Sequence, residues 1–309
     1  MGKLLIVGTV AFDSVETPFG SASNILGGAA TYIALAASNF DVDAAVVSVV
    51  GEDFPKKHTD LFTNRGIDIT ALEVVKGGKS FFWSGRYNND MNTRQTLETQ
   101  LNVLADFNPI VPEQYKDARI LMLGNLHPQI QLDVIGQMTK RPELIVLDTM
   151  DYWMENAWDK LMEVITKIDV LTINDQEARQ LTKEYSLVKA AQKIMKMGVK
   201  YVVIKKGEHG VLSFFEDSIF FAPALPLEEV FDPTGAGDTF AGGFTGYLAQ
   251  SDTIDFETIK NAIIFGSNMA SFCVEKFGTE RMINLTKPEI YRRLLQFKEL
   301  TQFEISIEE

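Results

Sequence analysis

A run of small residues precedes a lone carboxylate in the stretch DPTGAGDTFAGGF, residues 232–244. Gly235, Ala236 and Gly237 stand where a helical pattern begins, and such small residues leave backbone N–H groups open to a ligand. The N-terminal end of a helix carries partial positive charge. The stretch therefore predicts a binding site for an anion. Asp238 follows directly, where its carboxylate could accept a proton from a hydroxyl beside that anion.

This combination suits phosphoryl transfer. Backbone dipoles would meet the charge on the transferred group, and the carboxylate of Asp238 would take the proton of the attacking hydroxyl. A positioned base is worth about 10²–10⁴-fold in rate. The same residues also fit an ordinary helix start, because Asp preceded by Gly is common there. The composition of the stretch by itself leaves both interpretations open.

The elements that must position these residues can be predicted from hydrophobic patterns. Near-continuous apolar runs, each ended by Gly, Asp or Asn, are typical of strands buried on both faces. They alternate with helical patterns, which predicts a parallel sheet covered by helices on both sides. The predicted strands are 3–8, 43–51, 119–124, 143–148, 169–174 and 200–207, and the predicted helices are 29–40, 54–66, 127–139, 156–166, 175–183 and 187–197.

Polar residues just past the ends of these strands are the next candidates. Open parallel sheets bind ligands at the carboxyl ends of their strands. The residues found there are Asp13, Asn125, His127, Asp148, Asn174 and Gly207.

One region interrupts the alternation of strands and helices. Residues 79–102 alternate polar and apolar side chains around a loop-like NND, which predicts a two-stranded ribbon that projects from the core. Together with residues 13–24 this ribbon would form a small β lid.

The stretch DPTGAGDTFAGGFT resembles the C-terminal signature of the PfkB/ribokinase family of carbohydrate and nucleoside kinases. The resemblance implies one ribokinase-like domain over residues 1–309: a three-layer α/β/α sandwich with a mostly parallel central sheet and a small β lid. It also implies an ATP-dependent kinase that acts on a small polyhydroxylated molecule. In that family pattern Asp238 is the catalytic base, and the amides of Gly235, Ala236 and Gly237 form the anion hole.

Two N-terminal stretches resemble the family's substrate side. ILGGAATYIALA places Gly27 and Gly28 near the substrate, and GTVAFD makes Asp13 a ligand of substrate hydroxyls. Many members carry Asn a few residues after the Gly pair as a sugar ligand, whereas this chain has Tyr32. The predicted substrate-binding residues are Asp13, Gly27, Gly28, Tyr32, Asn125 and Asp148.

Two C-terminal stretches resemble the family's nucleotide side. NDQEA matches its Asn-x-x-Glu, which implies that Asn174 and Glu177 help to hold Mg²⁺, mostly through waters. KKGEHGV resembles the nucleotide-binding turn. Asp232, with carbonyls of Cys273, Lys276 and Gly278, matches the K⁺ site of some members. The residues predicted to contact ATP are Asn174, Lys206, Gly207, Gly210 and Asn268.

The substrate stays open among a sugar, a nucleoside and a cyclitol. Tyr32 argues against a simple ribose or fructose site, and Phe82 and Trp83 on the lid could stack on a ring or fill the lid core. Arg86 or Arg94 could meet a phosphate or carboxylate, or face solvent. A kinase-like ligand sensor without activity is the alternative from another class, and an intact Asp238 argues against it.

Composition excludes several classes of protein. A net charge of −13 argues against a general nucleic-acid surface, and Glu73 breaks the P-loop pattern that EVVKGGKS otherwise imitates. The single cysteine, Cys273, excludes an internal disulfide and predicts a buried thiol in a cytoplasmic protein. Apolar runs are too short for a membrane span. Apolar residues on the lid predict a homodimer joined through the lids.

Overall fold

A nine-stranded sheet forms the centre of the chain, which is described here by a computed structural model over residues 2–302 and 304. The strand order is β13-β12-β11-β10-β9-β8-β1-β4-β5. All neighbours are parallel except β11 with β12 and β12 with β13. The strands are β1 (Gly2–Val7), β4 (Val42–Gly51), β5 (Asp68–Val75), β8 (Ile120–Leu123), β9 (Leu144–Asp148), β10 (Val170–Asn174), β11 (Tyr201–Lys205), β12 (Val211–Phe215) and β13 (Ser218–Ala222).

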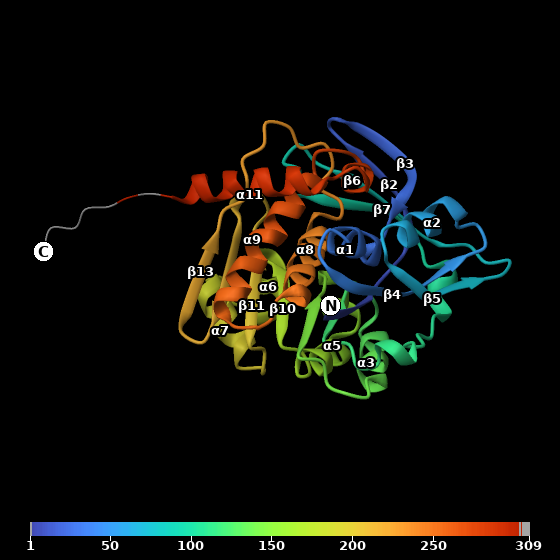
Figure 1. The fold of residues 1–309 in the computed structure, drawn as a ribbon, viewed down its shortest axis with the longest axis horizontal. Coiled ribbons are helices and arrows are strands. Elements are labelled where there is room, and N and C mark those ends of the chain that lie inside the picture. Colours follow the sequence, from blue (N-terminus) through green and yellow to red (C-terminus); the bar gives the residue numbers. More distant parts are fainter. Residues whose placement is uncertain (1, 303, 305–309) are drawn as a thin grey trace, which may run out of the picture.

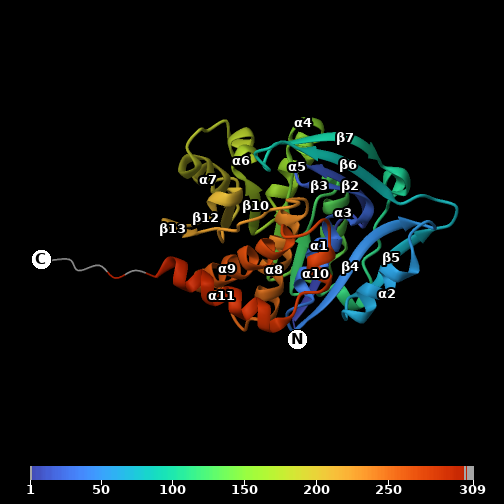
Figure 2. The ribbon, with the colours of Figure 1, turned by 90° about the horizontal axis from the view of Figure 1, so that it is seen from above.

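Helices cover both faces of this sheet, as Figures 1 and 2 show from two directions. One face carries α1 (Ala29–Ala37), α8 (Ala236–Gln250), α9 (Phe256–Cys273), α10 (Glu280–Ile283) and α11 (Lys287–Thr301), with α2 (Lys56–Asn64) near its edge. The other carries α3 (Pro128–Gln137), α4 (Asp151–Asn156), α5 (Trp158–Ile165), α6 (Asp175–Thr182) and α7 (Leu187–Met195).

The core lies in two layers, one on each side of the sheet. Along β1, Leu4 and Ile6 belong to the layer under α1 and α8, and Leu5 and Val7 belong to the opposite layer. Successive side chains of a strand point to opposite faces, so a strand buried on both sides must be apolar at every position. The predicted three-layer α/β/α architecture with a mostly parallel sheet is confirmed.

The helix predicted over 156–166 is α5, Trp158–Ile165, and a separate short helix, α4, precedes it. α4 ends at Asn156 and α5 begins at Trp158, because Ala157 takes φ −146° and ψ 38°, outside the helical region. The acidic tail FEISIEE, residues 303–309, has a sequence that fits a surface strand or disorder, and apart from residue 304 it lies outside the described residues.

A second sheet of four strands forms the lid. Its order is β3-β2-β6-β7, with β2 (Ala11–Thr17), β3 (Gly20–Gly27), β6 (Phe81–Tyr87) and β7 (Arg94–Gln100). The predicted ribbon is β6 and β7, and the N-terminal segment adds two strands because β2 pairs in parallel with β6. In Figure 2 the lid lies beyond the strand ends of the central sheet.

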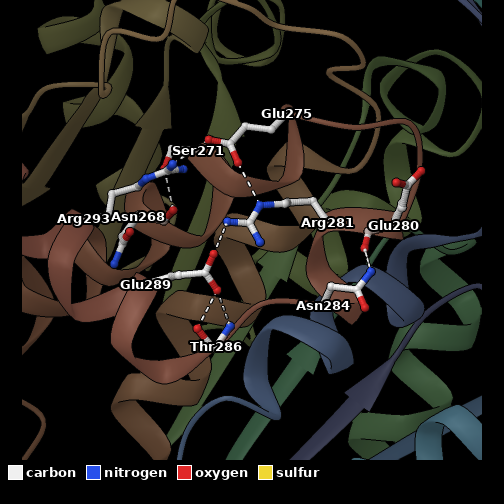
Figure 3. A network of polar contacts seen from close by, with 9 residues as sticks. All are labelled: Asn268, Ser271, Glu275, Glu280, Arg281, Asn284, Thr286, Glu289 and Arg293. Atoms are coloured by element: carbon white, nitrogen blue, oxygen red, sulfur yellow. Dashed lines mark hydrogen bonds and ion pairs between the residues drawn. The ribbon is translucent and has the colours of Figure 1, made fainter.

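A network of charges joins α9, α10 and α11 (Figure 3). Arg281 binds Glu275 at 2.9 Å and Glu289 at 2.8 Å, and Arg293 binds Glu275 at 2.5 Å. The guanidinium of Arg293 also stacks 3.5 Å from the centre of the Phe272 ring. Two arginines and two glutamates thus neutralise each other and hold the C-terminal helix against the core.

The helices of the described residues include none with the length and apolar character that crossing a bilayer requires.

Candidate active site

The predicted anion site lies at the start of α8. Gly235 is the N-cap residue with φ 75°, and α8 begins at Ala236, so Asp238 occupies the first turn. A Cβ on Gly235 would lie 2.5 Å from the ring of Tyr32. Both the left-handed backbone and this close contact require glycine at position 235. The N–H of Ala236 donates to the carbonyl of Pro233 at 3.2 Å, so the amides that this turn leaves for an anion are those of Gly235 and Gly237.

Asp13, on β2, lies against the Gly-Gly turn that starts α1. A Cβ on Gly27 would fall 1.9 Å from Oδ2 of Asp13, and Gly28 has φ 91°. The backbone N–H of Gly28 donates to the same oxygen at 3.4 Å. The two glycines leave room for this carboxylate, which puts Asp13 at the positive end of α1.

An ion pair joins the ends of two strands. Asp148, the last residue of β9, binds the ammonium of Lys205, the last residue of β11. The hydroxyl of Thr172, on β10 between them, donates to Asp148 at 3.0 Å. A Cβ on Gly237 would lie 3.1 Å from Nζ of Lys205, so the ammonium reaches the first turn of α8.

Asn174 and Glu177, the predicted Mg²⁺ residues, form a capping box at the start of α6. The N–H of Glu177 donates to Oδ1 of Asn174 at 2.7 Å, and the N–H of Asn174 donates to Glu177 at 2.9 Å. The two side chains therefore cap the N-terminus of α6. A metal role through waters is compatible with it, since each side-chain oxygen keeps further lone pairs.

Three carboxyl groups of the site have pKa values raised to about 7. For Asp238 the causes are burial and then the charge of Asp148, which Lys205 and Arg94 partly offset. For Asp13 and Glu177 burial is the largest cause. Burial acts to lower the pKa of Lys205, but the attraction of Asp148 overcomes it and the pKa is raised. Burial is thus the main cause of the raised pKa of all three carboxyl groups.

The nucleotide turn predicted after β11 is present. Gly207 and Gly210 have φ 55° and 80°, and a Cβ on Gly210 would lie 2.1 Å from the carbonyl of Ala222. A Cβ on Gly207 would lie 2.8 Å from Oδ1 of Asn92, at the tip of the lid. The lid therefore reaches across the site to this turn.

Asn268, which was predicted to contact ATP, makes a contact between two helices. Its side chain is fully buried on α9, and its amide donates to the carbonyl of Ile290 on α11 at 3.0 Å. It offers no exposed atom to a nucleotide, so this geometry gives the prediction for Asn268 no support.

Asp232 ties two loops together beneath the lid. One carboxylate oxygen accepts the N–H of Thr234 at 2.8 Å, and the other accepts the N–H of Gly278 at 2.9 Å. Cys273 is buried nearby, with its thiol 3.6 Å from the carbonyl of Thr234, and burial raises its pKa to about 12. The predicted burial of this thiol is confirmed.

Asn125 is held by an aromatic cluster on α4. The indole N–H of Trp153 donates to Oδ1 of Asn125 at 2.7 Å, and Nδ2 of Asn125 contacts the sulfur of Met150 at 3.1 Å. His127 caps α3 by accepting the N–H of Gln129 and packs edge-on to Trp153. His127 and Asn125 are thus both held by contacts within this cluster.

The two lid arginines differ in their surroundings. Arg86 binds Glu16 at 2.6 Å on the lid itself. Arg94 lies over the ring of Trp83, 5.4 Å from its centre, and its charge lowers the pKa of both Asp13 and Asp238. Of the two aromatic side chains predicted on the lid, Phe82 packs against the core, whereas Trp83 contacts the guanidinium of Arg94.

The sequence predictions missed Lys205 and selected its neighbour Lys206. Lys205 pairs in register with Asn174 on the adjacent strand, so both stand at the carboxyl end of the sheet. The sequence could have indicated Lys205 as a site residue, because Lys205 ends an apolar strand run in the same way as Asp148 and Asn174 do. No sequence pattern marked Trp153 or Asn92 as a site residue, because only the tertiary structure brings α4 and the tip of the lid to the site.

The comparisons with known proteins agree on one family. Residues 5–286 match the family model described as pfkB family carbohydrate kinase. A cytidine kinase from Thermococcus kodakarensis is 30% identical over 284 residues, which cover 90% of this chain and 98% of that protein.

Two solved structures share the fold. A nucleoside kinase from Burkholderia thailandensis in complex with inosine has a TM-score of 0.80 at 20% identity and covers 95% of this chain and 97% of its own. An E. coli protein described as a ribokinase II, in complex with ATP and Mg²⁺, has a TM-score of 0.78 at 16% identity and covers 97% of this chain and all of its own, 100%.

Proposed function

We propose that this chain, which belongs to the pfkB family of carbohydrate kinases, transfers the γ-phosphoryl group of ATP to a hydroxyl of a nucleoside. The family makes it a phosphotransferase with a hydroxyl acceptor. The observation that carries the reaction is the position of Asp238 in the first turn of α8, three residues after the left-handed N-cap residue Gly235.

The chemistry follows from this position. Asp13 would hold the acceptor, and the acceptor hydroxyl would lose its proton to Asp238. The oxygen would then form a bond to the γ-phosphorus as the bond from that phosphorus to the bridging oxygen breaks, which releases ADP. The amides of Gly235 and Gly237 would stabilise the charge on the transferred group. A pKa near 7 suits Asp238 to act as the base.

The residues of the site fit a divalent cation. Burial raises the pKa of both Glu177 and Asp238 to about 7, and the positive charges that act on Asp238 are those of Lys205 and Arg94. Mg²⁺ prefers carboxylate, amide and water oxygens. Asn174 and Glu177 would hold it, mainly through waters, and when bound it would neutralise phosphate charge.

A nucleoside is the acceptor that the relatives and the residues favour together. The cytidine kinase from T. kodakarensis matches over 98% of its length. In this chain Tyr32 stands where many family members carry a sugar-binding Asn, and its ring is buried against Gly235. Trp83 on the lid offers an aromatic face on which a base could stack.

A panel of acceptors tests the proposal. Purified protein with ATP and Mg²⁺ would be assayed against cytidine, uridine, adenosine, inosine, ribose, fructose and myo-inositol. We expect the highest kcat/KM with a nucleoside. A preference for ribose or fructose would establish the second candidate, a sugar kinase, which the family description supports. A preference for myo-inositol would establish a cyclitol kinase.

A monovalent cation is a further part of the proposal. Asp232 fixes the loops at Thr234 and Gly278, and K⁺ bound by nearby carbonyls would order the start of α8. The assay would be repeated in potassium, sodium and tetramethylammonium chloride at equal ionic strength. Equal rates in all three salts would remove K⁺ from the proposal.

We also propose a cytoplasmic homodimer joined through the lids. β7 is an edge strand that is exposed over its whole length, with Leu97 42% exposed, and such an edge can pair with another chain. The lone buried Cys273 needs no oxidising compartment. Light scattering of the wild type and of Leu97→Lys tests the dimer, because the charge should yield monomers.

A further inference from the structure

Lys205 occupies a place that no part of the reaction above has used. It ends β11 in register with Asn174, and 16% of its side chain is exposed to solvent. Its ammonium binds Asp148 and lies 3.1 Å from the position that a Cβ on Gly237 would take. The ammonium therefore sits between a carboxylate and the first turn of α8.

The start of a helix is an unfavourable place for a cation. The unpaired N–H groups and the helix dipole give α8 partial positive charge there, and a nearby ammonium is repelled. A lysine needed only to neutralise Asp148 would gain by lying farther from Gly237. Two positive groups that converge on one point instead provide a site for an anion larger and more highly charged than a single carboxylate.

We propose that Lys205 is a catalytic residue that binds the γ-phosphoryl group of ATP beside the first turn of α8. This inference rests on the proposed kinase function. A lysine acts on phosphate as a compact point charge with three donors, which suits a group whose oxygens move during transfer. Asp148 holds the ammonium in place.

The proton balance of the transfer is unchanged by this role. The acceptor proton goes to Asp238, the new bond joins the acceptor oxygen to the γ-phosphorus, and the bond to the bridging oxygen breaks. Lys205 keeps its proton throughout. It contributes attraction to the oxygens of the transferred group, whose negative charge it shares with the amides of Gly235 and Gly237.

The test compares Lys205→Met with Lys200→Met. Lys200 precedes the other end of β11, where its ammonium lies over the Tyr201 ring, so the control removes the same charge far from the site. We expect Lys205→Met to lower kcat by about 10²-fold or more, as loss of one donor to a developing oxyanion does. Lys200→Met should stay within about twofold of the wild type.

Nucleotide binding separates a phosphate contact from a structural role. Calorimetry would give the affinity of each variant for Mg·ADP and for a non-hydrolysable Mg·ATP analogue. Lys205→Met should lower the affinity ratio of analogue to ADP at least about tenfold and leave the affinity for ADP nearly unchanged. An equal loss for both nucleotides, or turnover close to the wild type, would overturn the proposal.

The double variant Lys205→Met/Asp148→Asn covers the case in which the single variant folds poorly. It removes the pair without leaving Asp148 charged and buried. We expect it to fold and to stay as inactive as Lys205→Met, with the same lowered affinity ratio; recovered turnover would mean that Lys205 only neutralises Asp148. If the wild type phosphorylates no acceptor, the proposed function fails, and the affinity ratio still decides whether Lys205 contacts the γ-phosphate.

Discussion

Two clusters of charge in this molecule have opposite characters. Around Arg281, two arginines and two glutamates pair at 2.5–2.9 Å, and the pKa of Glu289 falls to about 2, chiefly through Thr286 and Arg281. Around Lys205, three carboxylates share one ammonium, and burial raises the pKa of Asp238 and Glu177 to about 7. The first cluster is complete in the folded chain, whereas the second lacks positive charge.

The contrast distinguishes a structural network from a site built for a ligand. A neutral, fully paired network lowers the free energy of the folded chain, and nothing more need bind. Carboxylates crowded together without enough partners raise it, and such strain is characteristic of functional sites. Mg²⁺ would bring positive charge to these carboxylates. Four predictions test this distinction. The first three run from the substitution with the largest expected effect to the one with the smallest, and the fourth concerns pH.

Asp238→Asn should abolish most of the activity. Without a base for the acceptor proton, kcat should fall by about 10²–10⁴-fold. Asp217→Asn, in the exposed turn between β12 and β13, is the matched control and should keep full turnover. Transfer of phosphate from ATP to the preferred acceptor is the measurement. Turnover of Asp238→Asn within a few-fold of the wild type would remove Asp238 from the role of base.

Gly235→Ala should damage both stability and activity. The new methyl group would meet the Tyr32 ring at 2.5 Å in a backbone with φ 75°, so the free energy of unfolding should fall by about 2–4 kcal/mol.

Gly136→Ala is the control for that change and should act in the opposite direction. Gly136 lies in α3, where a Cβ meets nothing within 4 Å, so alanine should raise the free energy of unfolding by about 0.5–1 kcal/mol. Urea denaturation measures both variants. Equal effects would show that the start of α8 is not specially constrained.

Arg281→Met should lower stability and leave catalysis alone. It removes the central cation of the C-terminal network, while Arg293 remains to bind Glu275. The free energy of unfolding should fall by about 1–2 kcal/mol, and kcat should stay within twofold of the wild type. A large loss of kcat in a well-folded Arg281→Met protein would contradict the separation of the two clusters.

The pH dependence of stability gives a test that rests on the raised pKa of Asp238. Its pKa rises from 3.8 unfolded to about 7 folded, so folding favours the protonated form, and stability from this group is lost as pH rises from about 4 to 7. Asp238→Asn resembles the protonated form. It should therefore be more stable than the wild type at pH 8, by about 4 kcal/mol, and equal to it near pH 4.

Activity should follow the opposite course to stability. A base must be unprotonated, so kcat/KM of the wild type should rise through about pH 7 and then level off. Thermal unfolding and initial rates across pH 4–9 measure both trends. Asp238→Asn no more stable than the wild type at pH 8 would mean that folding does not raise the pKa of Asp238.

Much of the fold could be predicted because the signals are local. Apolar runs such as 143–148 end at a polar residue, and DPTGAGD places glycine where α8 starts. The alternation of strands and helices then requires a parallel sheet, whose strand ends all meet at one edge. Asp13, Asp148 and Asn174 could be selected on that basis alone.

The sequence by itself determined the order of the elements, the chemistry available at the strand ends and the family. The tertiary structure decided which neighbours face each other. It set Lys205 rather than Lys206 beside Gly237, buried Asn268 under α11, and brought Asn92 of the lid to Gly207. The physical reason is the distance along the chain over which each kind of interaction acts. Periodicity and turn residues act over a few positions of the chain, whereas contacts between distant elements depend on how whole helices and sheets pack.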